Sequence, residues 1–372
     1  MPTSSTPIST SSLALYRKYR PQDFGEVVGQ EAVVKALEGA ISQKKISHAY
    51  IFSGSRGTGK TSVARIFARA LKVSANDIYE IDAASNRGID DIRELRDGVN
   101  VMPFESPYKV YIVDEVHMLT KEAWNALLKT LEEPPSHVIF ILATTELEKI
   151  PDTIISRCQT FSFKKPSRDT LKDVVVRVSK KEGYSLEAGA AELVALLGDG
   201  SFRDTLGTLQ KVISAVGGVG GASSAGGASS KSERKITVAE TEAITGAPRG
   251  TIVNDFIAGI ATANAEQALG ALTTAGEAGV SMKTFATLVL EKYRIALLIR
   301  NAPLAAQRFQ DHVSEEDWKA LEKLAKTSTF TPASLIELLK AYDMIGRTYI
   351  DSLPLELAVM QIVGQNKAQA GA

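Results

Sequence analysis

The chain has 372 residues, of which 44% are hydrophobic and 23% charged, a mix typical of globular proteins. This length exceeds one ordinary hydrophobic core, so two or three domains are expected. Lys and Arg together number 43, as do Asp and Glu. The net charge of zero excludes nucleic-acid binding through overall charge, and any such contact must come from a local patch.

The single cysteine, Cys158, excludes an internal disulfide and a zinc site made only of cysteines. Such cysteine usage is typical of a protein in a reducing cytoplasm. Residues 1–12 are rich in Ser, Thr and Pro and lack the segments of a signal peptide, so they are predicted to be a disordered tail. No apolar run approaches the roughly 20 residues that span a bilayer, and no membrane contact is expected.

A segment rich in Tyr and Arg, residues 16–21, precedes a helical pattern of apolar residues at Val33, Val34, Leu37 and Ile41. By composition, the basic side chains of this segment, Arg20 included, read as a solvated face. The segment also lies upstream of the next motif, where a nucleotide base would need a cover.

A Gly-rich loop at residues 53–61 follows an apolar run at 49–52 and precedes a helical pattern from residue 62. Strand, loop, Lys-Thr and helix form the context that a G-x-x-x-x-G-K-T motif needs. Its glycines let backbone N–H groups point at phosphate oxygens. Lys60 can reach the β- and γ-phosphates, and Thr61 can bind Mg²⁺. The residues predicted to bind a nucleoside triphosphate here are Gly54, Ser55, Arg56, Gly57, Thr58, Gly59, Lys60, Thr61 and Ser62.

Residues 79–83 alternate like a strand, and residues 85–88 then open a helix at 89–95. Arg87 at this helix start is a plausible phosphate contact, because free N–H groups lie beside it. The alternative is a plain capped helix with an exposed arginine.

An apolar run at 110–113 ends in Asp114 and Glu115, which fits a central parallel strand whose carboxyl end meets the Gly-rich loop. Asp114 can then hold Mg²⁺, and Glu115 can polarise a water for attack on the γ-phosphate. Without that loop, the two acids would be no more than solvated strand ends. His117 is interpreted as a packed or hydrogen-bonded residue, because no partner His or Cys sits at metal-ligand spacing.

Thr120 is predicted to cap a helix over 121–133, and a buried strand is predicted over 138–143, beside the Asp114 strand. Thr145 follows that strand and could sense the γ-phosphate or hold the attacking water, or it could be a turn threonine. Arg157 ends a short helix, where an arginine is usually exposed or ion-paired.

From residue 166 the pattern becomes helical. Three helices over 166–216 predict a small separate domain, with Arg203 in the first turn of the last helix. There it opposes the helix dipole, so either an anionic ligand or a nearby acid compensates it. Residues 217–235 read as a flexible Gly/Ser-rich linker. Residues 236–364 predict an all-helical packing or oligomerisation domain, with a disordered tail at 365–372.

Together, six stretches make the chain resemble the gamma/tau family of bacterial DNA polymerase III, the AAA+ ATPases of the sliding-clamp loader. The resemblance is strong over residues 13–216 and weaker beyond. It implies an α/β AAA+ P-loop NTPase domain with a parallel central sheet at 13–165, a helical lid domain at 166–216 and an all-α collar domain at 236–364. The stretches that carry it are residues 16–21 (YRKYRP), 53–61, 80–88 (EIDAASNRG), 114–119 (DEVHML), 125–135 (NALLKTLEEPP) and 155–158 (ISRC).

The resemblance implies a role for each matching residue. Thr145 resembles the first sensor and Arg203 the second, and Arg157 resembles an arginine finger that acts on ATP held by a neighbouring subunit. Such a cation would stabilise developing charge on the phosphate. The implied catalytic residues are Lys60, Glu115, Thr145, Arg157 and Arg203; the Mg²⁺ ligands are Thr61 and Asp114; further ATP contacts are Arg20, Val27, Val28 and Arg203; and the DNA contacts are Arg87, Thr120 and Lys121.

The implied function is an ATP-hydrolysing motor subunit that loads the sliding clamp onto primer–template DNA, in a ring or spiral with same-type, delta-like and delta-prime-like subunits. The family's four-cysteine zinc module is missing, since residues 71–77 bridge the gap, so no zinc is expected. Against this resemblance, the chain is expected to be gamma-like in extent, without the long extension of the tau form. One alternative is a non-catalytic AAA+ stator, which the intact phosphate loop and Asp114-Glu115 disfavour. Another is a different AAA+ DNA-remodelling ATPase, which the ISRC and LEEPP stretches disfavour.

Overall fold

The computed structural model describes residues 13–86, 88–219, 234–313, 315–327 and 330–370. Two compact units divide the chain, one formed by residues 1–175 with 198–207 and the other by 176–197 with 208–372. Most of the predicted lid therefore belongs to the same unit as the predicted collar, and the boundary between these two domains stays a prediction. Across the described residues, no helix combines the length and the apolar character that membrane crossing requires.

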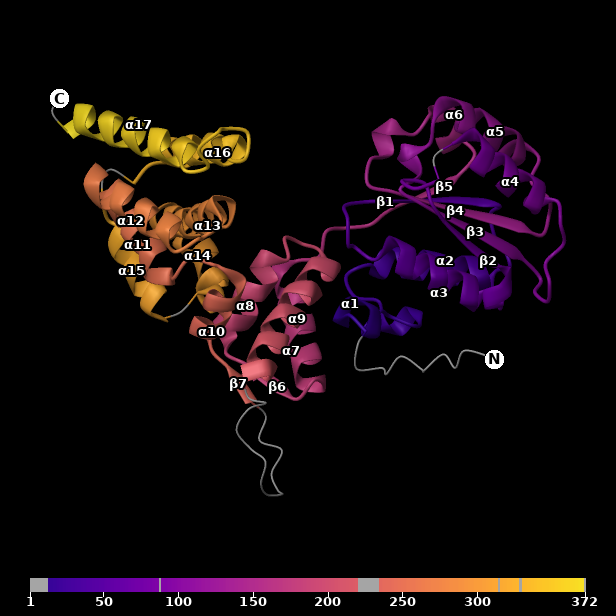
Figure 1. Ribbon diagram of the computed structural model, residues 1–372, viewed down its shortest axis with the longest axis horizontal. Helices are drawn as coiled ribbons and strands as arrows, with labels where there is room; N and C mark the ends of the chain where they lie inside the picture. The colour runs from indigo at the N-terminus through magenta and orange to yellow at the C-terminus, as the bar shows by residue number, and fades with distance from the viewer. Residues whose placement is uncertain (1–12, 87, 220–233, 314, 328–329, 371–372) are drawn as a thin grey trace, which may run out of the picture. The chain divides into compact units, whose positions relative to one another are not determined.

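Five parallel strands form the sheet of the first unit, in the order β2-β3-β4-β1-β5 (Figure 1). The predicted parallel sheet is confirmed, and β4 lies beside β3 as expected. Ser53 pairs with Thr144, and Asp82 pairs with Asp114, so neighbouring strands end at one level. The strands are β1 (Ala49–Ser53), β2 (Ile78–Asp82), β3 (Lys109–Asp114), β4 (Val138–Thr144) and β5 (Gln159–Ser162).

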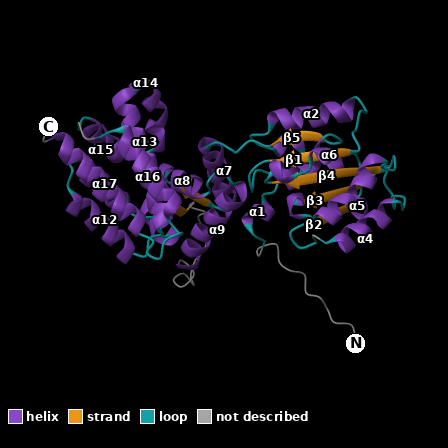
Figure 2. Ribbon diagram, turned by 90° about the horizontal axis from the view of Figure 1, so that it is seen from above, coloured by secondary structure: helices purple, strands orange, loops and turns teal. Residues whose placement is uncertain are grey.

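Helices cover both faces of this sheet, as Figure 1 and the view from above in Figure 2 show. Alternate residues of each strand point to opposite faces. Phe52 and Ile112 pack with α2 and α3, whereas Val113 and Leu142 pack with α4, α5 and α6. The helices are α1 (Leu15–Lys18), α2 (Glu31–Ser42), α3 (Lys60–Ala70), α4 (Ile89–Val99), α5 (Lys121–Glu132) and α6 (Asp152–Ile155), with the short turns η2 (Phe24–Glu26), η3 (Ala75–Asp77), η4 (Val116–Met118) and η5 (Leu147–Lys149).

The buried carboxylate of Asp77 holds the loop that enters β3. It accepts the backbone N–H groups of Phe104, Glu105 and Ser106 at 2.5, 3.1 and 3.0 Å. Burial raises the pKa of Asp77, but the N–H groups of Phe104 and Glu105 and both donors of Ser106 lower it by more, so the pKa lies below its usual value. The three backbone N–H groups of this loop are therefore satisfied by one carboxylate and not by carbonyl oxygens of a regular turn.

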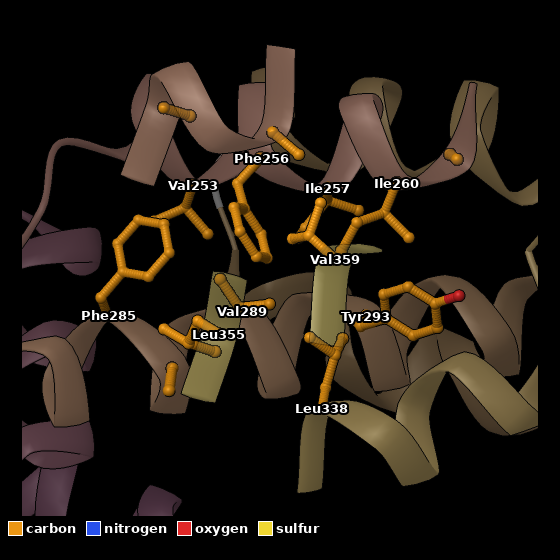
Figure 3. Packing of buried hydrophobic residues seen from close by; sticks show 14 of the residues in the cluster. Val253, Phe256, Ile257, Ile260, Phe285, Val289, Tyr293, Leu338, Leu355 and Val359 are labelled. Carbon is orange, nitrogen blue, oxygen red and sulfur yellow. The ribbon is translucent and has the colours of Figure 1, made fainter. Parts of the chain in front are cut away.

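The second unit is helical apart from a short strand pair, and its helices from α11 onward share one apolar core. Figure 3 shows Phe256 and Ile257 of one helix facing Phe285, Val289 and others of the next layer. The helices are α8 (Ala188–Leu197), α10 (Val238–Thr245), α11 (Gly250–Ala261), α12 (Ala265–Glu277), α13 (Met282–Asn301), α14 (Pro303–Ala306), η6 (Gln307–His312), α15 (Glu315–Ala325), α16 (Pro332–Met344) and α17 (Leu353–Ala370), while α7 (Arg168–Lys181) and α9 (Phe202–Val219) contribute residues to both units.

Three local features differ from the sequence predictions. The strands β6 (Tyr184–Leu186) and β7 (Arg234–Ile236) form a parallel pair that was not predicted. Helix α17 continues to Ala370, so residues 365–370 are helical and not a disordered tail, which suits their Gln, Lys and Ala content. Of the predicted linker, residues 217–219 end α9 and 234–235 begin β7, while 220–233 lie outside the described residues.

Candidate active site

The Gly-rich loop between β1 and α3 uses backbone conformations that favour glycine. Gly54, Gly57 and Gly59 have φ values of +146°, +74° and +102°. A Cβ at Gly54 would lie 2.5 Å from the Phe163 carbonyl oxygen, and one at Gly57 would lie 1.9 Å from Ser201 Oγ. At Gly59, which precedes α3 as its N-cap, an added Cβ would meet nothing within 4 Å. The loop is therefore packed on one side and open where the helix begins.

The remaining loop residues divide into exposed and anchored side chains. Ser55 and Arg56 are exposed, and Ser62 is half-buried in the first turn of α3. Thr58 is buried, and its hydroxyl donates to the Ser55 carbonyl at 2.9 Å. The Thr58 side chain thus holds the loop together by a hydrogen bond inside it, whereas the side chains of Ser55 and Arg56 stay accessible to solvent.

Lys60 is buried with only 6% of its surface exposed. Its ammonium donates to the carbonyl oxygens of Gly54 and Ser55 at 2.7 and 3.0 Å. Burial lowers the pKa of Lys60, and the positive charge of Arg203 lowers it too, whereas Glu115 and Asp114 oppose this shift. A buried ammonium whose closest partners are neutral carbonyls is poised for an anion.

Thr61 and Asp114 meet at the carboxyl edge of the sheet. The Thr61 hydroxyl donates to Asp114 Oδ2 at 2.8 Å, and the Glu115 N–H donates to Asp114 Oδ1 at 3.0 Å. A hydroxyl and a carboxylate are the hard oxygen ligands that Mg²⁺ prefers. These two side chains, predicted from sequence as Mg²⁺ ligands, therefore fit that ion.

Glu115 and Thr145 face each other across the ends of β3 and β4. The Thr145 hydroxyl donates to Glu115 Oε2 at 3.1 Å. Glu115 has φ +48° and ψ +42°, a left-handed backbone that is uncommon outside glycine and asparagine and costs about 1–3 kcal/mol. Such strain persists where surrounding contacts fix it, and it clusters at functional sites. Both predicted residues are thus brought together beside Asp114.

The N-terminal segment brings further cations to the same unit. The Arg203 guanidinium lies 5.8 Å from the centre of the Tyr16 ring, and Arg203 sits in the first turn of α9 as expected. Burial is the main cause that lowers the pKa of Arg20, and the charges of Arg65, Arg203 and Arg17 add to it, whereas Glu80 raises it. Val27 and Val28 are half-buried after η2.

Arg157 lies just beyond α6, two residues after the helix ends, and is ion-paired. Its Nη2 is 2.8 Å from Glu132 Oε1, and its Nη1 donates to the Thr153 carbonyl at 2.6 Å. The side chains of Arg157 and Glu132 are 36% and 48% exposed. The guanidinium therefore stands at the surface of the chain, bonded to α5.

Two of the three predicted DNA contacts can be located. Thr120 caps α5, because its hydroxyl accepts the Ala123 N–H at 3.3 Å, and Lys121 is exposed in the first turn. Arg87 lies outside the described residues. Helix α4 begins at Ile89 with Gly88 as its N-cap, whose N–H donates to Asp91 Oδ2 at 3.1 Å.

Sequence reasoning missed the side chain of Gln30 and one contact of His117 around the site. Gln30 is buried and exchanges two hydrogen bonds with the backbone of Lys164, at 2.8 and 3.1 Å, while its amide also reaches the Thr58 carbonyl at 3.4 Å. His117 was predicted to be packed or hydrogen-bonded, and it is both, but its link to Glu146 at 3.2 Å was not foreseen. The only sign of these contacts in the sequence was the position of each polar residue, Gln30 before the helical pattern at 33–41 and His117 directly after Asp114-Glu115.

The chain is similar to known proteins of DNA replication. A family model described as DNA polymerase III, delta subunit, matches residues 29–86 and 72–167. DNA polymerase III subunit tau of Bacillus subtilis is 50% identical over 227 residues, which cover 55% of this chain and 40% of that protein. DNA polymerase III subunit gamma/tau of Mycobacterium tuberculosis is 39% identical over 319 residues, 80% of this chain and 53% of that protein. The chain spans about half the length of these relatives.

A further relative extends the match, and solved structures agree in fold. DNA polymerase III subunit tau of Salmonella typhimurium is 33% identical over 365 residues, 91% of this chain and 53% of that protein. A mutant of Thermotoga maritima RuvB has a TM-score of 0.51 and 21% identity, over 65% of this chain and 79% of that one. A second RuvB mutant has a TM-score of 0.50 and 18% identity, over 82% and 90%. At these identities the likeness concerns the fold.

Proposed function

Because the chain is a homologue of the gamma/tau subunit of DNA polymerase III and belongs to the clamp-loader group of AAA+ proteins, we propose that it is an ATP-hydrolysing motor subunit of a clamp loader. It would use ATP binding and hydrolysis to load a sliding clamp onto primer–template DNA. Its proposed partners are same-type, delta-like and delta-prime-like subunits, the clamp and the DNA.

One observation carries the catalytic part of this proposal. The hydroxyl of Thr61 and the carboxylate of Asp114 are 2.8 Å apart, beside Glu115 and Thr145 and at the start of the helix that carries Lys60. A scaffold has no need to bring these groups to one edge of a sheet. The set supports phosphoryl transfer to water.

Each side chain has a distinct task in the proposed reaction. Lys60 exchanges its two carbonyl partners for phosphate oxygens, and the loop N–H groups bind the same phosphates. Thr61 and Asp114 hold Mg²⁺, which when bound neutralises charge on the phosphates. Glu115 orients the attacking water and receives its proton, once the hydroxyl of Thr145 turns from the carboxylate to the γ-phosphate.

Arg20, Val27, Val28 and Arg203 are proposed to contact the nucleotide within the same chain. The lowered pKa of Arg20 supports this. It reflects burial first and then repulsion by neighbouring arginines, and a bound polyphosphate would offset that repulsion. Arg157 is proposed to act on the nucleotide of a neighbouring subunit. Its exposed position supports an approach to another chain.

Two alternatives remain as competing functions. A non-catalytic stator would present Arg157 and hydrolyse nothing, and a different AAA+ DNA remodeller would hydrolyse ATP without a clamp. The gamma/tau relatives and the complete Thr61, Asp114 and Glu115 set favour the motor. Because the chain has one cysteine, we also propose that it binds no zinc. Zinc found by metal analysis of the purified protein would contradict this.

The deciding experiment measures ATP hydrolysis with and without primed DNA, clamp and partner subunits. The motor predicts hydrolysis that DNA and clamp stimulate together. Lys60→Ala should abolish binding of a fluorescent ATP analogue, whereas Lys45→Ala, which changes an exposed lysine before β1, should leave it unchanged. Hydrolysis that is absent under every condition supports the stator, and hydrolysis indifferent to the clamp supports the remodeller.

Arg157→Ala separates the proposed role in the neighbouring site from a role in the chain's own site. Binding of the ATP analogue to the isolated chain should stay within about threefold of wild type, while DNA-stimulated hydrolysis in the assembly should fall by about 10³-fold or more. Stimulation that survives the change would contradict the role of Arg157.

A further inference from the structure

His117 joins two turns that leave the same edge of the sheet. Its side chain is 6% exposed, and its Nε2 lies 3.2 Å from Glu146 Oε1. On its other side, Nδ1 lies 3.0 Å from Thr144 Oγ1 and 3.5 Å from Glu115 Oε2. The ring therefore fills the space between the strained Glu115 turn after β3 and the Glu146 turn after β4.

The hydrogen-bond roles around the ring follow from the chemistry of its neighbours. An ionised carboxylate only accepts, so Nε2 carries a hydrogen and donates it to Glu146. In the neutral ring Nδ1 then accepts, and the Thr144 hydroxyl is its donor. Thr144 Oγ1 in turn accepts the Glu146 N–H at 3.0 Å, which closes a ring of three hydrogen bonds. Glu115 keeps the Thr145 hydroxyl as its own donor at 3.1 Å.

Glu146 is fixed from the opposite side by Lys149. Its Oε2 lies 2.6 Å from Lys149 Nζ, one turn further along. The hydrogen bond from Lys149 is the main cause that lowers the pKa of Glu146, and the positive charge of Lys149 lowers it further. The carboxylate therefore stays ionised and keeps the ring oriented, as a carboxylate does behind other functional histidines.

The turn that Glu146 begins leads directly to Arg157. Turn η5 is closed by the Ile150 N–H, which donates to the Leu147 carbonyl at 3.0 Å, and Ile150 and Ile154 are buried in the core beneath α5. The Arg157 N–H donates to the Ile154 carbonyl at 3.0 Å. Packing and hydrogen bonds are thus continuous from the Glu146 carboxylate to the base of Arg157.

We propose that His117 is a positioning residue that fixes the Glu115 turn against the Glu146 turn, so that one subunit sets its own Glu115 and the Arg157 that it presents to a neighbour together. This inference rests on the proposed ATPase function. Glu115 has a left-handed backbone that its surroundings must impose, and the buried ring of His117 lies 3.5 Å from its Oε2 while bonded to the Glu146 turn. Losing the ring frees both turns at once.

The first test measures steady-state hydrolysis by the DNA-stimulated assembly. His117→Ala should lower kcat at least tenfold with KM within threefold, because a misplaced base costs rate more than binding. His117→Gln should recover activity, since its amide can donate to Glu146 from nearly the position of Nε2. His137→Ala is the matched control, because the half-buried His137 ring is hydrogen-bonded to the Val99 carbonyl at 3.2 Å, away from the Glu115 and Glu146 turns, and it should behave as wild type.

The second test isolates the effect on a neighbouring site. Two variant subunits are each assembled with wild-type neighbours. One carries Lys60→Ala alone, and the other carries both Lys60→Ala and His117→Ala. Neither variant hydrolyses ATP itself, so the rate per wild-type site reports what the variant presents. We expect at least a threefold lower rate with the double variant, and equal rates would overturn the coupling.

Failure of this inference differs from failure of the proposed function. If the wild-type assembly hydrolyses no ATP, the proposed function is wrong. If it hydrolyses ATP and His117→Ala matches His137→Ala in kcat, the positioning role is wrong. Should His117→Ala not fold, as judged by thermal melting and binding of the ATP analogue, Glu146→Ala removes the same link and must show the same loss of kcat.

Discussion

Replacing Gly57 by alanine tests whether the phosphate loop needs a residue without a Cβ at this turn. The backbone φ is +74°, and an added Cβ would lie 1.9 Å from Ser201 Oγ and 2.9 Å from Ser201 Cβ. A left-handed backbone costs an alanine roughly 1–2 kcal/mol, and an extra methyl group in a packed contact adds about 1–3 kcal/mol. We therefore expect Gly57→Ala to lower the free energy of unfolding by about 2–5 kcal/mol.

Gly59→Ala is the matched control, because its backbone is equally unfavourable but its surroundings are open. With φ at +102° and no atom within 4 Å of an added Cβ, it should lose only the roughly 1–2 kcal/mol of backbone strain. Ser201→Gly in the Gly57→Ala background removes the two nearest atoms and should restore part of the stability. Ser201→Gly alone loses a hydrogen bond from the Asp204 N–H at 3.2 Å, which the double-mutant cycle takes into account.

The assay is urea unfolding followed by the fluorescence of Trp124, which is 5% exposed in the first unit. All variants carry Trp318→Phe, so that the signal reports this unit alone. Equal losses for Gly57→Ala and Gly59→Ala, or no recovery with Ser201→Gly, would show that the contact with Ser201 does not limit the loop.

Three further changes test separate parts of the chain. Glu132→Gln frees Arg157 from an exposed ion pair that contributes about 0–1 kcal/mol. DNA-stimulated hydrolysis should therefore rise by no more than about fivefold. A fall in the rate would mean that Glu132 itself takes part in hydrolysis. Asp77→Asn should lower the free energy of unfolding by about 1.5–3 kcal/mol at pH 7. Because the pKa of Asp77 is depressed in the folded state, the wild-type advantage should be complete above about pH 4 and be lost as the pH falls through the lower folded-state pKa. A difference in the free energy of unfolding that does not change with pH would contradict this. Lys121→Ala should weaken DNA binding and reduce its salt slope by about one, unlike Lys45→Ala, and an unchanged slope would exclude a phosphate contact.

The sheet and its active edge were predictable because local patterns determine them. Apolar runs at residues 49–52 and 138–143 read as buried parallel strands, and the Gly-rich loop fixed where β1 must end. Parallel strands place their carboxyl ends together, so the neighbourhood of Lys60, Asp114 and Thr145 followed from chain order alone. The level pairing of Ser53 with Thr144 bears this out.

Contacts between residues far apart in the chain were not predictable in the same way. The bonds from Gln30 to Lys164 span 134 residues, and the pair of Glu132 with Arg157 depends on how α6 packs against α5. Strands β6 and β7 have three residues each, too few for a periodic pattern. Helix α4 takes Gly88 as its N-cap, although Ser85 and Asn86 are the better capping residues by composition.

The ion pair of Arg157 with Glu132 bears on the proposed action of Arg157 at the nucleotide of a neighbouring subunit. A buried pair would lose about 3–5 kcal/mol on breaking, whereas an exposed pair loses about 0–1 kcal/mol. With Arg157 36% exposed and Glu132 48% exposed, the guanidinium is held in a defined place yet released at low cost. A neighbouring nucleotide needs only a small advantage over Glu132 to take it. The free energy of assembly can therefore go into aligning the sites and not into freeing the cation.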